Sequence, residues 1–325
     1  MEEVIALGGA VWRARLLFRL AITRAEFLLQ LLGLEEAVLV GERIFDEWTP
    51  KDLIAHIAAW DELFAGRIEL ILEGREDEIV GVEADEQNAI FYQERRNLSL
   101  AEAVGALGMA RADFLTALSR LSDDEIRQQR HFPWGDASVA WWVQLAYEHD
   151  EEHGHHLHLW REEGGLGWNV GPKPLLLAAQ AAARQELLLA AALLPPDERT
   201  TRPVCGIWTL RDLLGHVADW EFFCADALRR FLAGEIDRVL HDGDYLAWND
   251  AQAAARQGQP WEQVWADFQQ AHREVTALLQ GLSQADLARR FPNPWDENST
   301  VYFWLATFVG HDHEHAQDLR KSLEL

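Results

Sequence analysis

Two pairs of histidines at helical spacing are the residues of this chain that could do chemistry. His149 and His153 stand four residues apart in the first half, and His311 and His315 repeat the pattern near the C-terminus. On an α-helix, side chains four residues apart lie on one face, one turn from each other. Two imidazoles placed in this way provide half of a metal site, because neutral imidazole is a common metal ligand.

A single histidine stands upstream of each pair, His56 in the first half and His216 in the second. His56 lies on or beside an apolar stripe, and a buried imidazole needs partners for both ring nitrogens. Three imidazoles from two helices make a facial site with open positions, which suits Zn²⁺, Ni²⁺ or Fe²⁺. The sequence therefore predicts two divalent-metal sites: His56, His149 and His153, and His216, His311 and His315. The alternative is that these histidines are hydrogen-bonded polar groups of the core.

The elements that must position these histidines occur twice. The motif W-T-x-x-D-L-x-x-H-x-A-x-W begins at Trp48 and again at Trp208, 160 residues later. Asn88 matches Asn249 with an offset of 161, and the histidine pairs match with an offset of 162. This slow drift indicates two full-length copies of one unit. We expect domains at 1–164 and 172–325, joined by a linker rich in glycine and proline at 165–171.

Each copy is predicted to form four helices, which makes the fold all-α, with two tandem four-helix bundles. In the first copy the expected ranges are 4–34, 49–73, 99–121 and 138–163. In the second, helices are expected over 174–194 and after Thr209, Pro260 and Thr300. Thr49, Pro50 and Asp52 form a helix-start signal, a capping box with proline at the first helical position. Asn88 is expected in an acidic connection, and no strand is predicted.

Composition excludes several classes of function. The chain has 325 residues and a net charge of −25, which argues against a nucleic-acid partner and against an anionic membrane surface. Cys205 and Cys224 are its two cysteines, too few for a disulfide framework or a cysteine zinc site. The N-terminal segment contains acidic residues and arginines, which fits neither a signal peptide nor a membrane span. We expect a cytoplasmic protein without a membrane or nucleic-acid partner.

Other residues near the histidines have competing interpretations. Trp60 and Trp220, one turn after the single histidines, could wall a pocket or pack in the core. Glu152 and Glu314 fit H-x-x-E-H, in which a glutamate acts as a general base, but a solvated face or a contact to a metal ligand is the preferred interpretation. Asp52 and its counterpart Asp212 are explained by capping. Cys224 is predicted to be a core residue, and His155, His156 and His158 are predicted to be surface residues or an adventitious metal site.

The helix motif together with the distant H-x-x-x-H resembles the DinB/YfiT-like superfamily of metalloenzymes, once in each half. Tyr147 to Arg161 of the first copy is especially similar to the ClbS/DfsB branch. The resemblance implies an up-down-down-up bundle with a long crossover, and a divalent metal, commonly Zn²⁺ or Ni²⁺, held by the two histidine trios. It also implies that the two halves pack as a pseudo-dimer, so that the protein is a monomer or a homodimer.

The resemblance implies chemistry on a small-molecule substrate. Some members of the superfamily are transferases or isomerases that use a low-molecular-weight thiol such as bacillithiol, mycothiol or glutathione, and others open a reactive ring of a toxin. The leading hypothesis is a metal-dependent thiol S-transferase or hydrolase acting on an electrophile. The alternative is a non-catalytic protein that binds a small molecule or toxin for self-resistance, with structural or vestigial metal sites. A purely structural role ranks third.

Overall fold

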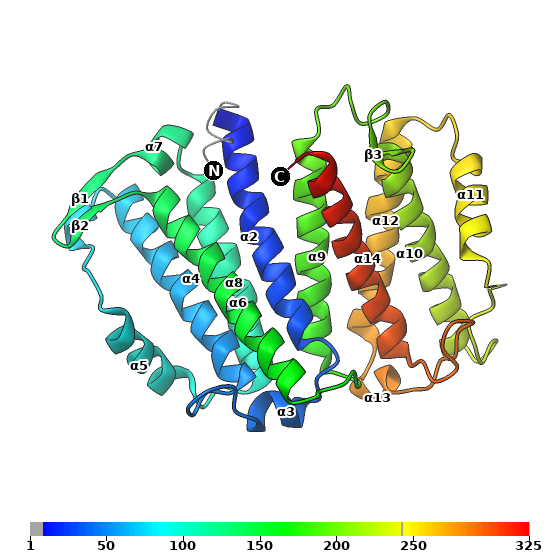
Figure 1. Cartoon of the computed structure of the whole chain (residues 1–325), viewed down its shortest axis with the longest axis horizontal. Coiled ribbons are helices and arrows are strands. Elements are labelled where there is room, and N and C mark those ends of the chain that lie inside the picture. Colours follow the sequence, from blue (N-terminus) through cyan, green and yellow to red (C-terminus); the bar gives the residue numbers. More distant parts are fainter. Residues whose placement is uncertain (1–8, 242, 325) are drawn as a thin grey trace. The chain divides into compact units, whose positions relative to one another are not determined.

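The computed structural model describes residues 9–241 and 243–324, and Figure 1 shows that it is mostly helical. The chain divides into two compact units, Met1–Asn169 and Val170–Leu325. The prediction of an all-α protein with two tandem bundles is confirmed. Residues 4–8 of the first predicted helix lie outside the described residues.

The first unit contains four long helices and several short elements. The long helices are α2 (Gly9–Leu31), α4 (Pro50–Leu72), α6 (Leu100–Ser119) and α8 (Val139–Glu163). The shorter elements are α3 (Glu36–Gly41), η1 (Glu76–Glu78), α5 (Ala84–Arg95), α7 (Asp123–Arg127), β1 (Arg130–Phe132) and β2 (Gly135–Ala137).

The second unit repeats this order. Its long helices are α9 (Lys173–Leu193), α10 (Leu210–Leu232), α12 (Trp261–Gly281) and α14 (Val301–Ser322). Its shorter elements are α11 (Tyr245–Ala255), α13 (Gln284–Leu287), β3 (Pro203–Cys205) and β4 (Trp208–Thr209).

Side-chain contacts in the first unit show the up-down-down-up order. Contacts between α4 and α6 advance together along both helices, so these helices run in parallel: Asp61 with Arg111, Phe64 with Phe114, and Glu69 with Arg120. The contacts of α2 with α8 advance in the same way: Arg24 with Asp150, and Gln30 with Arg161. Contacts between α4 and α8 run in opposite order: His56 with His149, and Arg67 with Trp142. The α4–α8 pair is therefore antiparallel.

Helix starts follow the capping signals in the sequence. The Thr49 hydroxyl accepts a hydrogen bond from the Asp52 amide, and the Asp52 carboxylate accepts one from the Thr49 amide. Thr209 and Asp212 repeat the same box at the start of α10. Both boxes satisfy amides that have no partner within their own helix. The single histidines follow one to two turns later, so the caps fix where those histidines lie.

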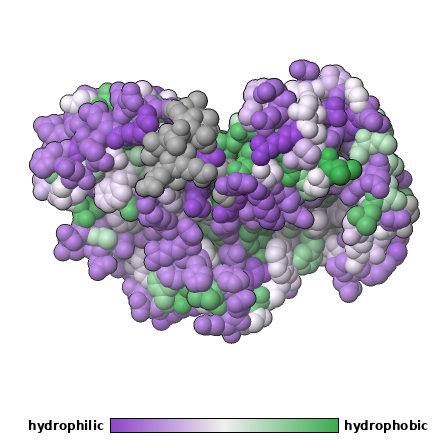
Figure 2. Space-filling view, turned by 45° about the horizontal axis from the view of Figure 1, so that its top comes forward, coloured by the Kyte–Doolittle hydropathy of each residue, from purple (hydrophilic) through white to green (hydrophobic). Residues whose placement is uncertain are grey.

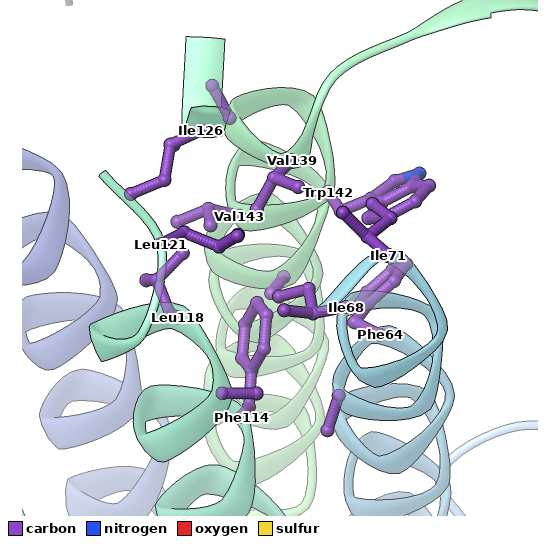
Figure 3. Packing of buried hydrophobic residues seen from close by; sticks show 14 of the residues in the cluster. Phe64, Ile68, Ile71, Phe114, Leu118, Leu121, Ile126, Val139, Trp142 and Val143 are labelled. Atoms are coloured by element: carbon purple, nitrogen blue, oxygen red, sulfur yellow. The ribbon is translucent and has the colours of Figure 1, made fainter. Parts of the chain in front are cut away.

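One hydrophobic cluster of the first unit packs α2, α4, α6 and α8 together. Figure 3 shows Phe64, Ile68 and Ile71 of α4 packed against Phe114 of α6 and Trp142 of α8. Phe114 and Trp142 are fully buried. His56 precedes this cluster on α4, and His149 and His153 follow it on α8. Because α4 and α8 are antiparallel, the three histidines meet beyond this cluster, where buried Leu53, Ile57 and Leu157 continue the apolar core along the same helices.

Two predictions about the connections are wrong. The residues around Asn88 and Asn249 form helices α5 and α11, not irregular connections. Short strands are also present, with β1 pairing with β2 and β3 with β4, both antiparallel. At two or three residues each, these strands are too short for an alternating pattern to emerge. In addition, the first predicted helix ends earlier, at Leu31, because Gly33 has a positive φ of 75°.

The beginning of the predicted linker packs on the first unit. The Trp168 ring lies against Gly33, where a Cβ would come within 2.5 Å of it. The Asn169 amide donates to the Gly33 carbonyl at 2.7 Å, and the Arg161 guanidinium stacks over Trp168. Gly33 is therefore required both by its backbone conformation and by the close approach of an indole.

The exposed surface fits the acidic composition. The face in Figure 2 is mostly hydrophilic, with smaller hydrophobic patches among the polar side chains. Within the described residues, one helix, Lys173–Leu193, is long and apolar enough to cross a membrane, and 61% of its most apolar window is buried within the protein. A core helix of a bundle has the same character.

Candidate metal centres

The first histidine trio is assembled as predicted. The Nε2 atoms of His56 and His149 are 2.8 Å apart, and those of His153 and His149 are 2.9 Å apart. His56 and His153 are buried, with 5% and 8% of their surface exposed. Three nitrogens from α4 and α8 thus converge on one point.

The second trio repeats this geometry with α10 and α14. The Nε2 atoms of His216 and His311 are 2.9 Å apart, and those of His315 and His311 are 3.0 Å apart. In each trio the candidate ligand atoms all lie within 4.8 Å of one another. The six histidines therefore form two separate clusters, one in each unit.

The electrostatics of both trios suit a cation. Burial, together with the neighbouring imidazoles, lowers the pKa of His56 to about 2, and burial lowers that of His216 to about 3. Burial, followed by the charge of His156, lowers the pKa of His153 to about 4, and burial lowers the pKa of His149 and of His311 well below 6.5. All these rings are neutral near pH 7, as a metal ligand must be.

The convergence of the nitrogens also fits a metal. The Nε2 atom of His149 faces two other Nε2 atoms but has only one lone pair or one proton to offer, so hydrogen bonding alone leaves one contact unsatisfied. A cation accepts all three lone pairs together. The ligands of a tetrahedral Zn²⁺ lie about 3.3 Å apart, close to the observed separations. The residues present therefore fit a divalent metal bound by three imidazoles.

The Nδ1 atoms of the histidines, which are the ring nitrogens outside each cluster of Nε2 atoms, have different partners in the two sites. The Nδ1 atoms of His56 and His216 are buried and have no hydrogen-bond partner among the described residues. In the second site, His315 Nδ1 lies 3.2 Å from the Asp318 carboxylate, an arrangement that orients a ligand and raises its basicity. In the first site, His153 Nδ1 faces His156 Nδ1 at 3.4 Å. His156 is thus half-buried beside the trio, and its prediction as a surface residue is wrong.

A buried ion network beside the first trio was missed by the sequence analysis. Each long helix of the unit contributes one charged residue: Arg24, Asp61, Arg111 and Asp150. Arg24 donates two hydrogen bonds to Asp150 and one to Asp61, all of 3.0 Å. Arg111 donates to Asp61 at 2.8 Å and to Asp150 at 3.0 Å. Asp150 is fully buried and adjacent to His149, so the network fixes the rotation of α8 that aims both ligands.

The second unit has a reduced form of this network, made of Arg184, Glu221, His272 and Asp312. Arg184 binds Asp312 at 2.8 Å and Glu221 at 2.7 Å, and His272 contacts Glu221 at 3.0 Å. One guanidinium here pairs with two carboxylates, whereas the first unit has two guanidiniums for its two carboxylates. Burial raises the pKa of Asp312 to about 7 against the opposing charge of Arg184, and the charge of Glu221 contributes to the rise. The sequence did contain a signal for these networks, because charged residues such as Arg24 and Arg184 occur at equivalent positions within otherwise apolar helices.

A pocket of about 550 Å³ opens at the second trio. Its wall is mainly aromatic and includes Trp208, Trp220, Trp295, Trp304 and Phe308. The Trp220 indole donates to the Asn249 carboxamide oxygen at 2.8 Å, which fixes both side chains at the wall. This volume is typical of sites for small molecules.

The remaining predicted residues fall in different places. Glu314 lines the pocket with the second trio, whereas Glu152 lines an open surface groove beside α2. Trp60 packs 6.1 Å from the His149 ring and donates to Asn88. Cys224 is fully buried, as expected of a core residue.

Two further histidines and the other cysteine were also singled out in the sequence or lie near the second trio. His155 and His158 lie on the surface. Cys205 lines the pocket, and burial, with Asp318 adding, raises the pKa of its thiol to about 11. That thiol is therefore protonated near neutral pH and is a poor nucleophile.

Comparison with known proteins identifies the family. The model of the DinB superfamily matches residues 19–157 and again residues 180–319. Searches among curated proteins and among solved structures gave no match. The superfamily is associated with metal binding, and both histidine trios are compatible with a metal site. With one match over most of each unit, the chain belongs to the DinB superfamily and contains two tandem copies of its domain.

Proposed function

We propose that the protein is a divalent-metal-dependent enzyme that acts on a small electrophilic molecule by thiol transfer or hydrolysis. The observation that supports this most is the convergence of three neutral imidazole nitrogens, in the second unit at the base of an aromatic pocket. Zn²⁺ and Ni²⁺ both suit a set of three imidazoles. We also propose a cytoplasmic location and, from the sequence of Tyr147 to Arg161, a ClbS/DfsB-like relationship.

The roles of the residues follow from their positions. His216, His311 and His315 would hold the cation, whose positive charge would acidify a bound thiol or water. Asp318 holds the His315 ring in orientation. The tryptophans of the pocket bind the apolar part of the substrate and exclude water, and Glu314 is the carboxylate at the pocket that we assign as proton acceptor.

Metal content tests the first part of the proposal. Elemental mass spectrometry of untagged wild-type protein should give about two equivalents per chain. His153→Ala and His315→Ala should each lose one equivalent, while exposed His131→Ala keeps both. Absence of metal even after incubation with Zn²⁺, Ni²⁺ or Mn²⁺ would contradict the proposal.

Turnover separates the enzyme from the alternative, a binding protein for self-resistance, which the tryptophan-rich pocket also favours. Styrene oxide should be consumed catalytically in the presence of metal, with the product showing whether glutathione, cysteine or water has added. A chelator and His315→Ala should both abolish the reaction. If each chain removes no more than one equivalent of styrene oxide and no further turnover follows, the result would favour the binding protein.

A further inference from the structure

The two histidine trios lie in different surroundings. At the second trio, the pocket lies over His216, His311 and His315. In the first unit, a crevice beside His56 is lined by Phe91 and Tyr92 among others; it does not reach His149 or His153 and is too narrow for a water molecule. The metal ligands are the same, so the difference comes from the side chains around them.

A row of rings occupies this position in the first unit. Tyr92 stacks on Trp48 with centroids 5.2 Å apart, and Trp48 meets the edge of His56 at 5.0 Å. Phe45 contacts Trp48 at 6.0 Å and His156 at 5.8 Å, and His156 contacts His153 at 5.5 Å. The rings form a continuous cover from α5 to α8 beside the trio.

Three of these rings are replaced by smaller side chains in the second unit. Cys205 stands where the first unit has Phe45, Ala253 replaces Tyr92, and Asp318 replaces His156. Trp208 is kept and lies 4.8 Å from the His216 ring. Replacing a phenyl, a phenol and an imidazole by a thiol, a methyl and a carboxylate removes aromatic volume around the trio.

The backbone supports this matching of positions. Phe45 pairs with Trp48 across a turn in which Asp46 has φ of 46°, and Cys205 pairs with Trp208 across a turn in which Gly206 has φ of 57°. On α5 and α11, the hydrogen bonds from Trp60 to Asn88 and from Trp220 to Asn249 are equivalent. Tyr92 and Ala253 each follow these asparagines by four residues.

The pocket also restricts the chemistry of its ligand. Of the described residues that line it, none is lysine or arginine, and its carboxylates are Glu314 and Asp318. A ligand with several anionic groups would have no cationic side chain to bind. A flat aromatic molecule would instead stack on Trp295, which is 46% exposed, and one coordinating group could reach the trio.

We propose that the two copies have divided their roles. The second unit takes the substrate, a flat aromatic molecule with at most one anionic group, while the first unit is a closed, structural metal site covered by its own rings. The assignment of this ligand as the substrate rests on the proposed function, but the difference in binding between the two units does not.

Calorimetric titration of the full-length, Zn²⁺-loaded protein tests the proposal with two metal-chelating probes. 2-Naphthohydroxamic acid carries an aromatic body, and acetohydroxamic acid carries only a methyl group. The aryl probe should bind one equivalent per chain, at least about tenfold more tightly than the methyl probe. His315→Ala should abolish this tight binding and His153→Ala should retain it.

Exchanging the covering residues between the units should remove aryl binding from the second unit and create it in the first. Cys205→Phe should remove the advantage of the aryl probe in the second unit, and the double variant Phe45→Ala, Tyr92→Ala should create a second aryl site in the first. Trp295→Ala should weaken aryl binding, whereas Trp134→Ala, its counterpart in the first unit, should not. Circular dichroism shows whether each variant is folded.

The possible failures can be told apart. Two equivalents of aryl probe in wild type, one equivalent lost with His153→Ala, or equal affinity for both hydroxamates would overturn the proposal. If neither trio binds metal, the proposed function fails. 2-Naphthylmethanol, which needs no metal, then tests the pocket alone. Binding of one equivalent to the wild-type protein that is lost in Cys205→Phe supports the division of roles, and no binding to the wild-type protein refutes it.

Discussion

The same substitution at two matched positions should have unequal costs. Asp150 accepts three hydrogen bonds of 3.0 Å from two buried guanidiniums, Arg24 and Arg111. Asp150→Asn leaves these two cations with Asp61 as their only buried carboxylate partner among the described residues. Removing one partner from a buried ion network typically costs about 3–5 kcal/mol. We expect a loss of this size in the free energy of unfolding of the first unit.

Asp312→Asn should cost much less. Burial already disfavours the charged form of Asp312, and Arg184 keeps Glu221 as a partner at 2.7 Å. The loss should therefore be that of a hydrogen bond, about 1 kcal/mol. The side-chain substitution is the same in both variants, so the difference between their losses of stability measures how strongly each buried network depends on its aspartate.

Hydrogen exchange read by mass spectrometry follows the two units separately. With chelator present at pH 7, amides of α8 should lose protection strongly in Asp150→Asn, while those of α14 change little in Asp312→Asn. Glu151→Gln, an exposed neighbour on α8, is the control and should change stability by less than about 0.5 kcal/mol. Equal losses at Asp150 and Asp312, or a neutral Asp150→Asn, would refute the argument.

Two further predictions concern acid stability and helix starts. In chelated protein, the lowered pKa values of His56, His153 and His216 mean that the unfolded chain binds more protons below pH 6.5. Their stabilisation is complete above pH 6.5 and decreases as pH falls, by about 1 kcal/mol per histidine and pH unit; calorimetry that shows no loss between pH 7.5 and 5.5 would contradict this. Thr49→Ala and Thr209→Ala should each cost about 1 kcal/mol in urea denaturation, because each removes the side-chain acceptor of a capping box; a neutral effect at both would show that the caps are dispensable.

The sequence predicted the bundles and the trios because their signals are local and repeated. Capping boxes set the start of α4 and α10, and the spacing of four residues placed His149 with His153 on one face. Pairing His56 with them needed only the inference that two helices of one bundle meet. The Nε2 distances of 2.8 and 2.9 Å confirm that these residues come together.

Other features depend on contacts between distant residues and were not predictable in this way. The network of Arg24, Asp61, Arg111 and Asp150 needs the relative rotation of four helices, which no single stretch of sequence specifies. Helix α5 has no clear apolar face from which it could be predicted, since none of its residues is buried. The aromatic cover of the first trio depends on Phe45 and Tyr92, which lie outside the helices that carry the histidines.

The packing of Trp168 on Gly33 decides where this protein can be cut into independent fragments. The glycine-rich segment that follows α8 suggests a boundary at Gly164, but the indole and the Asn169 amide beyond it belong to the first unit. A fragment that stops at Gly164 would lose both contacts and leave the end of α2 uncovered. Proteolysis or expression of separate halves should therefore be directed to the few residues between Asn169 and Pro172.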